Sequence, residues 1–150
     1  KERAIITLTS TGASLTTGSA GDAATTLDAR SGGNAAQDLQ ARLELVCQWA
    51  TITGIVKGTV AAELYLLPAL DGTNYPDVDV TSGTSAIPYE SFVGQFTCIK
   101  APTANTNMRF VSGVIDLHPV LYKAYILNKS GQTIAVNWSL KVVPAQAQYT

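Results

Sequence analysis

The feature that most constrains the fold is a strict alternation of apolar and other side chains that begins near residue 38. In residues 39–49 the apolar set is Leu39, Ala41, Leu43, Leu45, Cys47 and Trp49. The positions between them are mostly polar. A period of two places alternate side chains on opposite faces of an extended strand. The pattern therefore predicts a strand with one buried face rather than a helix.

Five later segments are also predicted as strands, at about 59–67, 92–98, 109–117, 121–127 and 134–142. Gly, Pro, Asn and Asp residues mark turns between several of these segments, and no segment has a persuasive helical period. The segments predict an all-β chain. We expect an antiparallel β-sandwich, with a jelly roll as its topology.

Parity within each segment assigns side chains to faces. In 59–67 the residues Val60, Ala62, Leu64 and Leu66 share one face, with Glu63 and Tyr65 on the other. Shared faces are also expected for Phe92, Gly94, Phe96 and Cys98, and for Arg109, Val111, Ile115 and Leu117. In the last segment Ile134, Val136, Trp138, Leu140 and Val142 are predicted to face inward.

The first 37 residues have a different composition. From Thr7 onward Thr, Ser, Gly and Ala dominate, and the only larger apolar side chains are Leu8, Leu15 and Leu27. Such a segment cannot bury enough surface to form a core of its own. We expect an extended N-terminal arm over 1–37 and a sandwich domain over 38–150. Residues 4–9 are predicted to form a short strand added to a sheet edge.

Charge is sparse in this chain. Charged residues make up 14% and the net charge is −1, whereas a typical soluble domain has about 25% charged residues. A nucleic-acid partner and a membrane-surface partner are therefore not expected, and no apolar stretch approaches the roughly 18 residues that span a bilayer. A weakly charged surface suits a subunit that lies against other subunits, and a polar, independently soluble surface is the alternative.

The sequence does not predict catalysis, a cofactor or a metal. The only histidine, His118, follows Asp116 at a predicted strand end, and no serine or cysteine has the Gly-x-Ser-x-Gly context of a nucleophile. A surface turn histidine is the favoured interpretation. Cys47 and Cys98 lie in predicted strands, so we expect two reduced core thiols in a chain made in a reducing compartment.

The loop from Asp71 to Asp79 leaves two binding alternatives open. Its oxygen-bearing side chains include Asp71, Asn74, Asp77 and Asp79. Calcium prefers such ligands, but the spacing is not that of an EF-hand, and ordinary turns use the same residues. The loop also holds Tyr75, which together with Tyr65, Tyr89 and Trp49 forms a candidate sugar-binding surface. Core or interface packing is the usual role of such aromatic residues.

Residues 62–77, which read Ala-Glu-Leu-Tyr-Leu-Leu-Pro-Ala-Leu-Asp-Gly-Thr-Asn-Tyr-Pro-Asp, resemble a segment of small structural proteins from tailed bacteriophages. In those proteins a strand ending in Pro leads into an Asp-Gly-Thr-Asn-Tyr turn. The sequences at 93–96, 122–131 and 138–141 continue the similarity, which covers about 38–143.

The resemblance implies a non-enzymatic virion protein that is assembled in the host cytoplasm. A capsid decoration (cement) protein that binds the major capsid protein is the leading expectation, with a homotrimer as its oligomer. A neck- or tail-associated structural or glycan-binding module is the alternative. Contacts with other subunits are expected from two places: Ile5, Ile6, Leu8, Leu15 and Leu27 in the arm, and Asp71, Asn74, Tyr75 and Asp77 in the loop.

Overall fold

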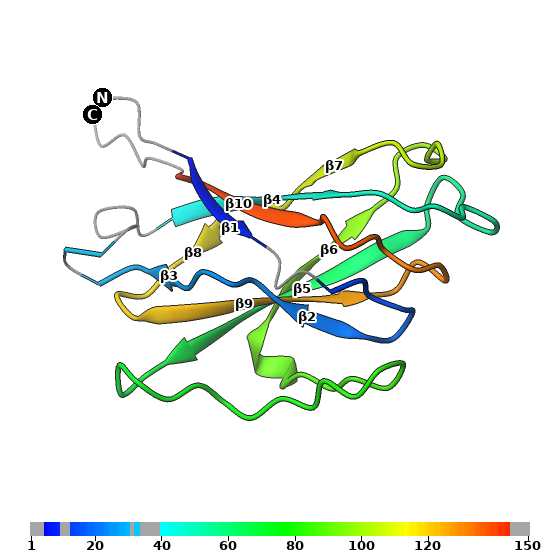
Figure 1. Cartoon of the computed structure of the whole chain (residues 1–150). Helices are drawn as coiled ribbons and strands as arrows, with labels where there is room; N and C mark the ends of the chain where they lie inside the picture. Colours follow the sequence, from blue (N-terminus) through cyan, green and yellow to red (C-terminus); the bar gives the residue numbers. More distant parts are fainter. Residues whose placement is uncertain (1–4, 10–12, 31, 34–39, 145–150) are drawn as a thin grey trace.

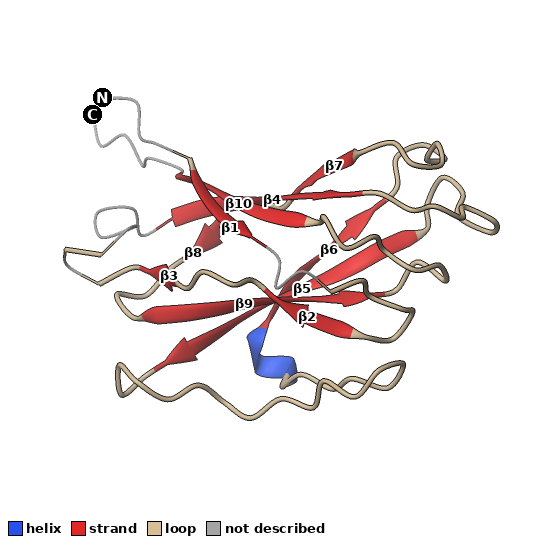
Figure 2. Cartoon of the chain, viewed as in Figure 1, coloured by secondary structure: helices blue, strands red, loops and turns tan. Residues whose placement is uncertain are grey.

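The computed structural model describes residues 5–9, 13–30, 32–33 and 40–144, and in these residues the chain is built from strands. The strands are β1 (Ile6–Thr9), β2 (Ala20–Asp22), β3 (Leu27–Asp28), β4 (Gln40–Cys47), β5 (Val60–Ala69), β6 (Phe92–Thr97), β7 (Met108–Val111), β8 (Ile115–Asp116), β9 (Leu121–Asn128) and β10 (Ser139–Pro144). One turn of 3-10 helix, η1 (Tyr89–Ser91), precedes β6. Figure 2 shows how this short turn stands among the strands.

The strands form two antiparallel sheets packed face to face, which confirms the predicted antiparallel β-sandwich (Figure 1). Sheet 1 has the order β1-β10-β4-β7, and β8 continues along the same edge of β4 as β7. Sheet 2 has the order β2-β9-β5-β6, and β3 continues along the same edge of β9 as β2. Each sheet therefore has four strand positions.

The core lies between the two sheets and is supplied by the alternation seen in the sequence. In β4 the side chains of Ala41, Leu43 and Leu45 are fully buried, while Arg42 between them is exposed. Trp49 lies just beyond β4 and is also fully buried. The predicted inward face of this strand is thus confirmed from residue 41 to residue 49. Leu39 lies outside the described residues.

The described part of residues 1–37 belongs to the sandwich, which corrects the expectation of an extended arm. The edge strand β1 pairs with β10, as predicted for a short added strand, and β2 and β3 pair with β9. Leu8, Leu15 and Leu27 are all buried in the core. Small residues permit this close packing, because a Cβ atom at Gly21 would collide with the side chains of Leu15 and Trp138.

A β-bulge in β6 changes the predicted faces of that strand. Leu64 pairs with Gly94 while Tyr65 pairs with Phe92, so Val93 is an extra residue on β6. One extra residue moves the following side chains to the opposite face. Phe96 therefore packs in the core, whereas Phe92 packs on the outer face of sheet 2. The predicted common face of these two residues was wrong.

Two other segments also lose the regular alternation. In β7 the side chains of Met108 and Phe110 are buried, while Arg109 between them is exposed. Ile115 of β8 has the same parity as Arg109 but is buried, because residues 112–114 interrupt the strand. The predicted shared face of Arg109 and Ile115 was wrong. Near the C-terminus a turn at 136–137 separates the isolated bridge at Ile134 from β10. This turn leaves Val136 exposed instead of inward-facing.

The outer face of sheet 2 carries a second hydrophobic cluster, which the sequence did not predict. Its buried members are Ala20, Tyr65, Leu67, Tyr125 and Leu127. Residues 70–91, which connect β5 to β6, fold back over this face, and Figure 1 shows them in green beneath the sheet. This covering segment is tied to the region before β2, because the amide of Ser85 donates a hydrogen bond to the carbonyl of Gly18 (2.9 Å).

Candidate functional site

The candidate site is the side of the sandwich where β6 of sheet 2 and β7–β8 of sheet 1 form the sheet edges. Within the described residues, no other strand pairs with the outer edges of these strands. A strand edge presents backbone N–H and C=O groups to solvent, and it is a template for pairing with another chain. We call the surface between these edges the open side.

Two clefts lie along the open side. The first has a volume of about 210 Å³ and lies between the start of β6 and β8. Its lining is largely apolar, including Leu66, Phe92 and Tyr122, and it also includes Glu90 and His118. The second cleft has a volume of about 190 Å³ and lies between the end of β6 and β7. Both clefts are lined in part by core residues, including Leu66 and Tyr122 in the first and Phe96 and Phe110 in the second.

Exposed apolar side chains are concentrated on the open side. The described part of the chain has nine large hydrophobic residues with exposed side chains, and five of them belong to the segments along this side. These five are Leu70, Tyr89, Ile99, Val111 and Val114. Leu70, Tyr89 and Ile99 are each at least 80% exposed. Single exposed apolar residues are ordinary, whereas several of them along one side are typical of a surface of interaction.

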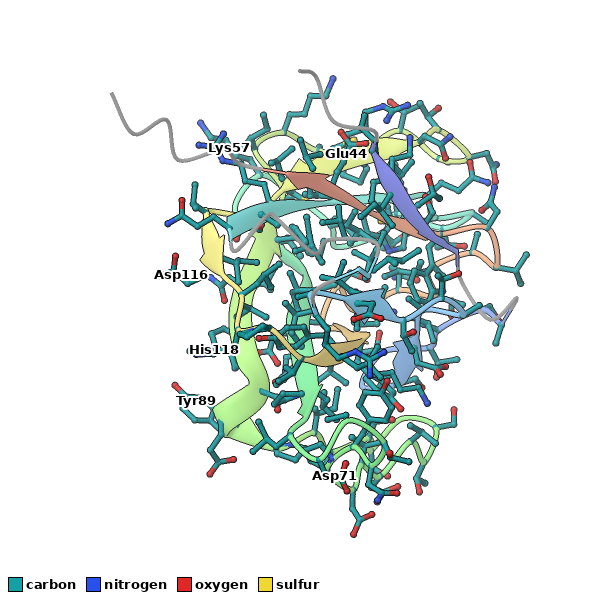
Figure 3. The ribbon with its side chains drawn as sticks, turned by 90° about the vertical axis from the view of Figure 1, so that its left-hand side faces the viewer. Glu44, Lys57, Asp71, Tyr89, Asp116 and His118 are labelled. Carbon is teal, nitrogen blue, oxygen red and sulfur yellow. The ribbon has the colours of Figure 1, made fainter. Side chains whose placement is uncertain are left out.

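The polar groups of the first cleft do not form a catalytic pair within the described residues. The backbone amide of His118 donates a hydrogen bond to Tyr122 Oη (2.8 Å), and Asp116 Oδ1 accepts one from Gln40 Nε2 (2.8 Å). The imidazole makes no hydrogen bond to Asp116 or Glu90 among the described residues, and no group of three acidic, histidine or cysteine side chains is placed there to hold a metal ion. Figure 3 shows Asp116, His118 and Tyr89 in a column at one margin of the molecule.

The residues predicted for contact in the N-terminal segment divide into two groups. Leu8, Leu15 and Leu27 are buried in the core, so they are not available to another subunit in this fold, and their predicted interface role is corrected. These leucines are not available for contact because their side chains fill the space between the two sheets. Ile5 is 59% exposed and Ile6 is half-buried on the edge strand β1, so both remain accessible.

The carboxylates of the 71–79 loop stabilise turns. Asp71 Oδ1 accepts hydrogen bonds from the backbone amides of Asn74 (2.7 Å) and Thr73 (2.8 Å), and its Oδ2 accepts one from Asn74 Nδ2 (2.8 Å). These hydrogen bonds lower the pKa of Asp71, and the bond from the backbone amide of Asn74 has the largest effect. Asp79 accepts hydrogen bonds from the hydroxyl and the amide of Thr81, which lower its pKa in the same way. The exposed Asp77 completes the predicted loop set.

The predicted aromatic surface for sugar binding is not assembled. Trp49 is fully buried, where its indole N–H donates to Ser130 Oγ (3.0 Å), and Tyr65 is buried in the second cluster. Tyr75 is half-buried against that same cluster. Of the four aromatic residues, Tyr89 is the exposed one, and it lies on the open side stacked on Phe92 (ring centroids 5.8 Å apart).

Both cysteines are free and buried, as predicted. Burial raises the pKa of Cys47 to about 12 and also raises the pKa of Cys98. A thiol with a raised pKa is a poor nucleophile, because the thiolate is the reactive form. These two residues therefore act as small core side chains.

The comparisons with known proteins do not identify the chain: no family model matches it, and neither a curated protein nor a solved structure matches. In the described residues, no helix combines the length and hydrophobicity that a membrane-spanning helix needs. Sequence reasoning missed the open side, because which strands lie at sheet edges depends on strand order. No signal in the sequence marks Leu70, which directly follows β5, or Ile99, which lies just beyond β6, as exposed.

Proposed function

We propose that this chain is a non-enzymatic structural protein of a virion. Its role is that of a capsid decoration protein, which binds the major capsid protein and stabilises the assembled shell. The resemblance of residues 62–77 to tailed-phage structural proteins supports this proposal, and so does the low content of charged residues, 14%.

The observation that carries the proposal is the order of the strands, from which we also infer a jelly roll. Counting β2–β3 and β7–β8 as one position each, the chain has eight positions in two sheets. The first position pairs with the eighth, the second with the seventh, the third with the sixth and the fourth with the fifth. This nested pairing arises when one long antiparallel hairpin folds over into two sheets, as in a jelly roll. The jelly roll occurs in viral capsid proteins.

The residues best placed for contact with the shell are at the opposite edge of sheet 1 from the open side. Ile5 is exposed just before β1, and Ile6 is half-buried on that edge strand. These are the two members of the predicted N-terminal contact set that are not buried, although Ile6 also packs in part against the core. An exposed isoleucine beside a sheet edge offers both apolar area and backbone groups to a partner.

The test is addition of the purified chain to capsids that lack it. We expect the chain to co-sediment with the shells and to raise the temperature at which they release their contents. Ile5→Lys is expected to weaken co-sedimentation, whereas Val80→Lys is the matched control, because the two native side chains are 59% and 54% exposed. Absence of any affinity for such shells would contradict the proposal.

A further inference from the structure

We propose that the open side is an interface between two copies of this chain related by a two-fold axis, with the β6 strands of the two copies antiparallel. The inference does not rest on the proposed virion role. Its first support is the group of exposed apolar side chains, Leu70 and Tyr89 toward one end and Ile99 and Val111 toward the other. Burial of such side chains by a partner is favourable, because apolar surface is removed from water.

The second support is the chemistry of the β6 edge. Its sequence, Phe-Val-Gly-Gln-Phe-Thr, contains no charged residue and no proline. Natural edge strands commonly carry a lysine or a proline that prevents pairing with other chains. β6 has the bulge at Val93 but neither of these residues. Antiparallel pairing with a second β6 would satisfy the outward backbone groups and join the two copies of sheet 2.

The third support is the distribution of charge, which selects the orientation of the second copy. Glu90 and Asp116 line the first cleft, and Arg109 and Ile99 line the second; Lys100 directly follows Ile99 in the chain. Arg109 contacts Glu44 (2.9 Å), and that carboxylate also lies 4.0 Å from Lys141 of β10, so these three side chains together carry one net positive charge.

An antiparallel arrangement about a two-fold axis places the acidic end of one copy against the basic end of the other. A parallel arrangement would place like charges together, which is unfavourable. In a two-fold interface each contact occurs twice, so both ends are matched at once. Leu70 and Tyr89 of one copy would then face Ile99 and Val111 of the other.

The area that a stable pair needs is a small share of the surface of this chain. A standard interface takes roughly 800 Å² from each partner. The chain exposes 8008 Å² in total, so such an interface needs about a tenth of its surface. The proposed interface would have to bury this share of each copy.

The experiment is sedimentation velocity and light scattering of the purified full chain over a range of concentrations. We expect a particle of twice the 15.8 kDa chain mass. Val111→Lys is expected to give a monomer, and Val80→Lys to leave the dimer intact, because these valines are 57% and 54% exposed but only Val111 lies on the open side. A wild-type monomer, a trimer, or equal effects of the two variants would overturn the proposal.

A charge swap tests the orientation of the two copies. It also distinguishes loss of affinity through charge repulsion from loss through misfolding. Glu90→Lys alone and Lys100→Glu alone each place like charges across the interface, and each is expected to raise the dimer dissociation constant by about ten-fold. The double variant restores opposite charges and is expected to recover most of the wild-type affinity. Recovery cannot arise from two independently misfolded variants. Additive weakening in the double variant would overturn the antiparallel two-fold arrangement.

Discussion

Replacement of Leu27 by alanine tests whether the N-terminal segment is part of the core. Leu27 is in β3, pairs with Tyr122 of β9 and has no exposed surface. The change removes three carbon groups at about 0.8 kcal/mol each, or about 2.4 kcal/mol of transfer free energy. The cavity that remains brings the expected loss of stability to about 2–5 kcal/mol. This is a large share of the 5–15 kcal/mol by which a domain of this kind is stable.

The assay is urea unfolding followed by tryptophan fluorescence, because Trp49 and Trp138 are both buried in the same core. Ile5→Ala is the control, since it shortens an apolar side chain of the same N-terminal segment that is 59% exposed. We expect this control to change the free energy of unfolding by no more than about 0.5 kcal/mol. Equal effects of Leu27→Ala and Ile5→Ala would refute the integration of this segment into the sandwich.

Two further predictions concern stability. The pKa of Cys47 is about 12 in the folded chain, above its ordinary value of 9.0, so its contribution to stability is complete below pH 9 and is lost as the pH rises from 9 to 12. We expect the urea midpoint to fall over this range, and Cys47→Ala to be less stable at pH 7 but to show a shallower fall. Gly18 and Gly32 both have a positive φ, but a Cβ atom at Gly18 would collide with the carbonyl of Gly83, whereas at Gly32 the space is empty. Gly18→Ala is therefore expected to cost about 1–3 kcal/mol more than Gly32→Ala in urea unfolding, and equal costs would contradict the close packing at Gly83.

Sequence reasoning predicted the parts of the fold that depend on local pattern. The alternation from Ala41 to Trp49 was confirmed. In a regular strand, successive side chains point to opposite faces, so the sequence alone is enough to assign the face of each one. The assignment failed at Val93 and at Val136, where a bulge and a turn interrupt the period. Such interruptions depend on the partner strand and on the connection that follows, and neither is encoded in the alternation itself.

The candidate site was predicted poorly for a related reason. The loop residues Asp71 and Asn74 were chosen for their chemistry, yet their polar groups are used in a turn. The sequence does not predict Leu70 and Ile99 as contact residues, because exposure of a single apolar residue beside a strand cannot be recognised without the fold. Leu15 and Leu27 were assigned to an arm because their own segment is too poor in apolar residues to fold alone.

The class of the fold and the inward residues of its regular strands can therefore be predicted from local pattern, because both follow from the two-residue period of an extended chain. Three features become visible only in the folded chain: the described part of residues 1–37 belongs to the sandwich, residues 70–91 cover sheet 2, and β6 and β7–β8 are the edges of one side. These features arise from contacts between segments far apart in sequence. The order of strands in a sheet is set by how all the buried faces fit together, and no local pattern records it.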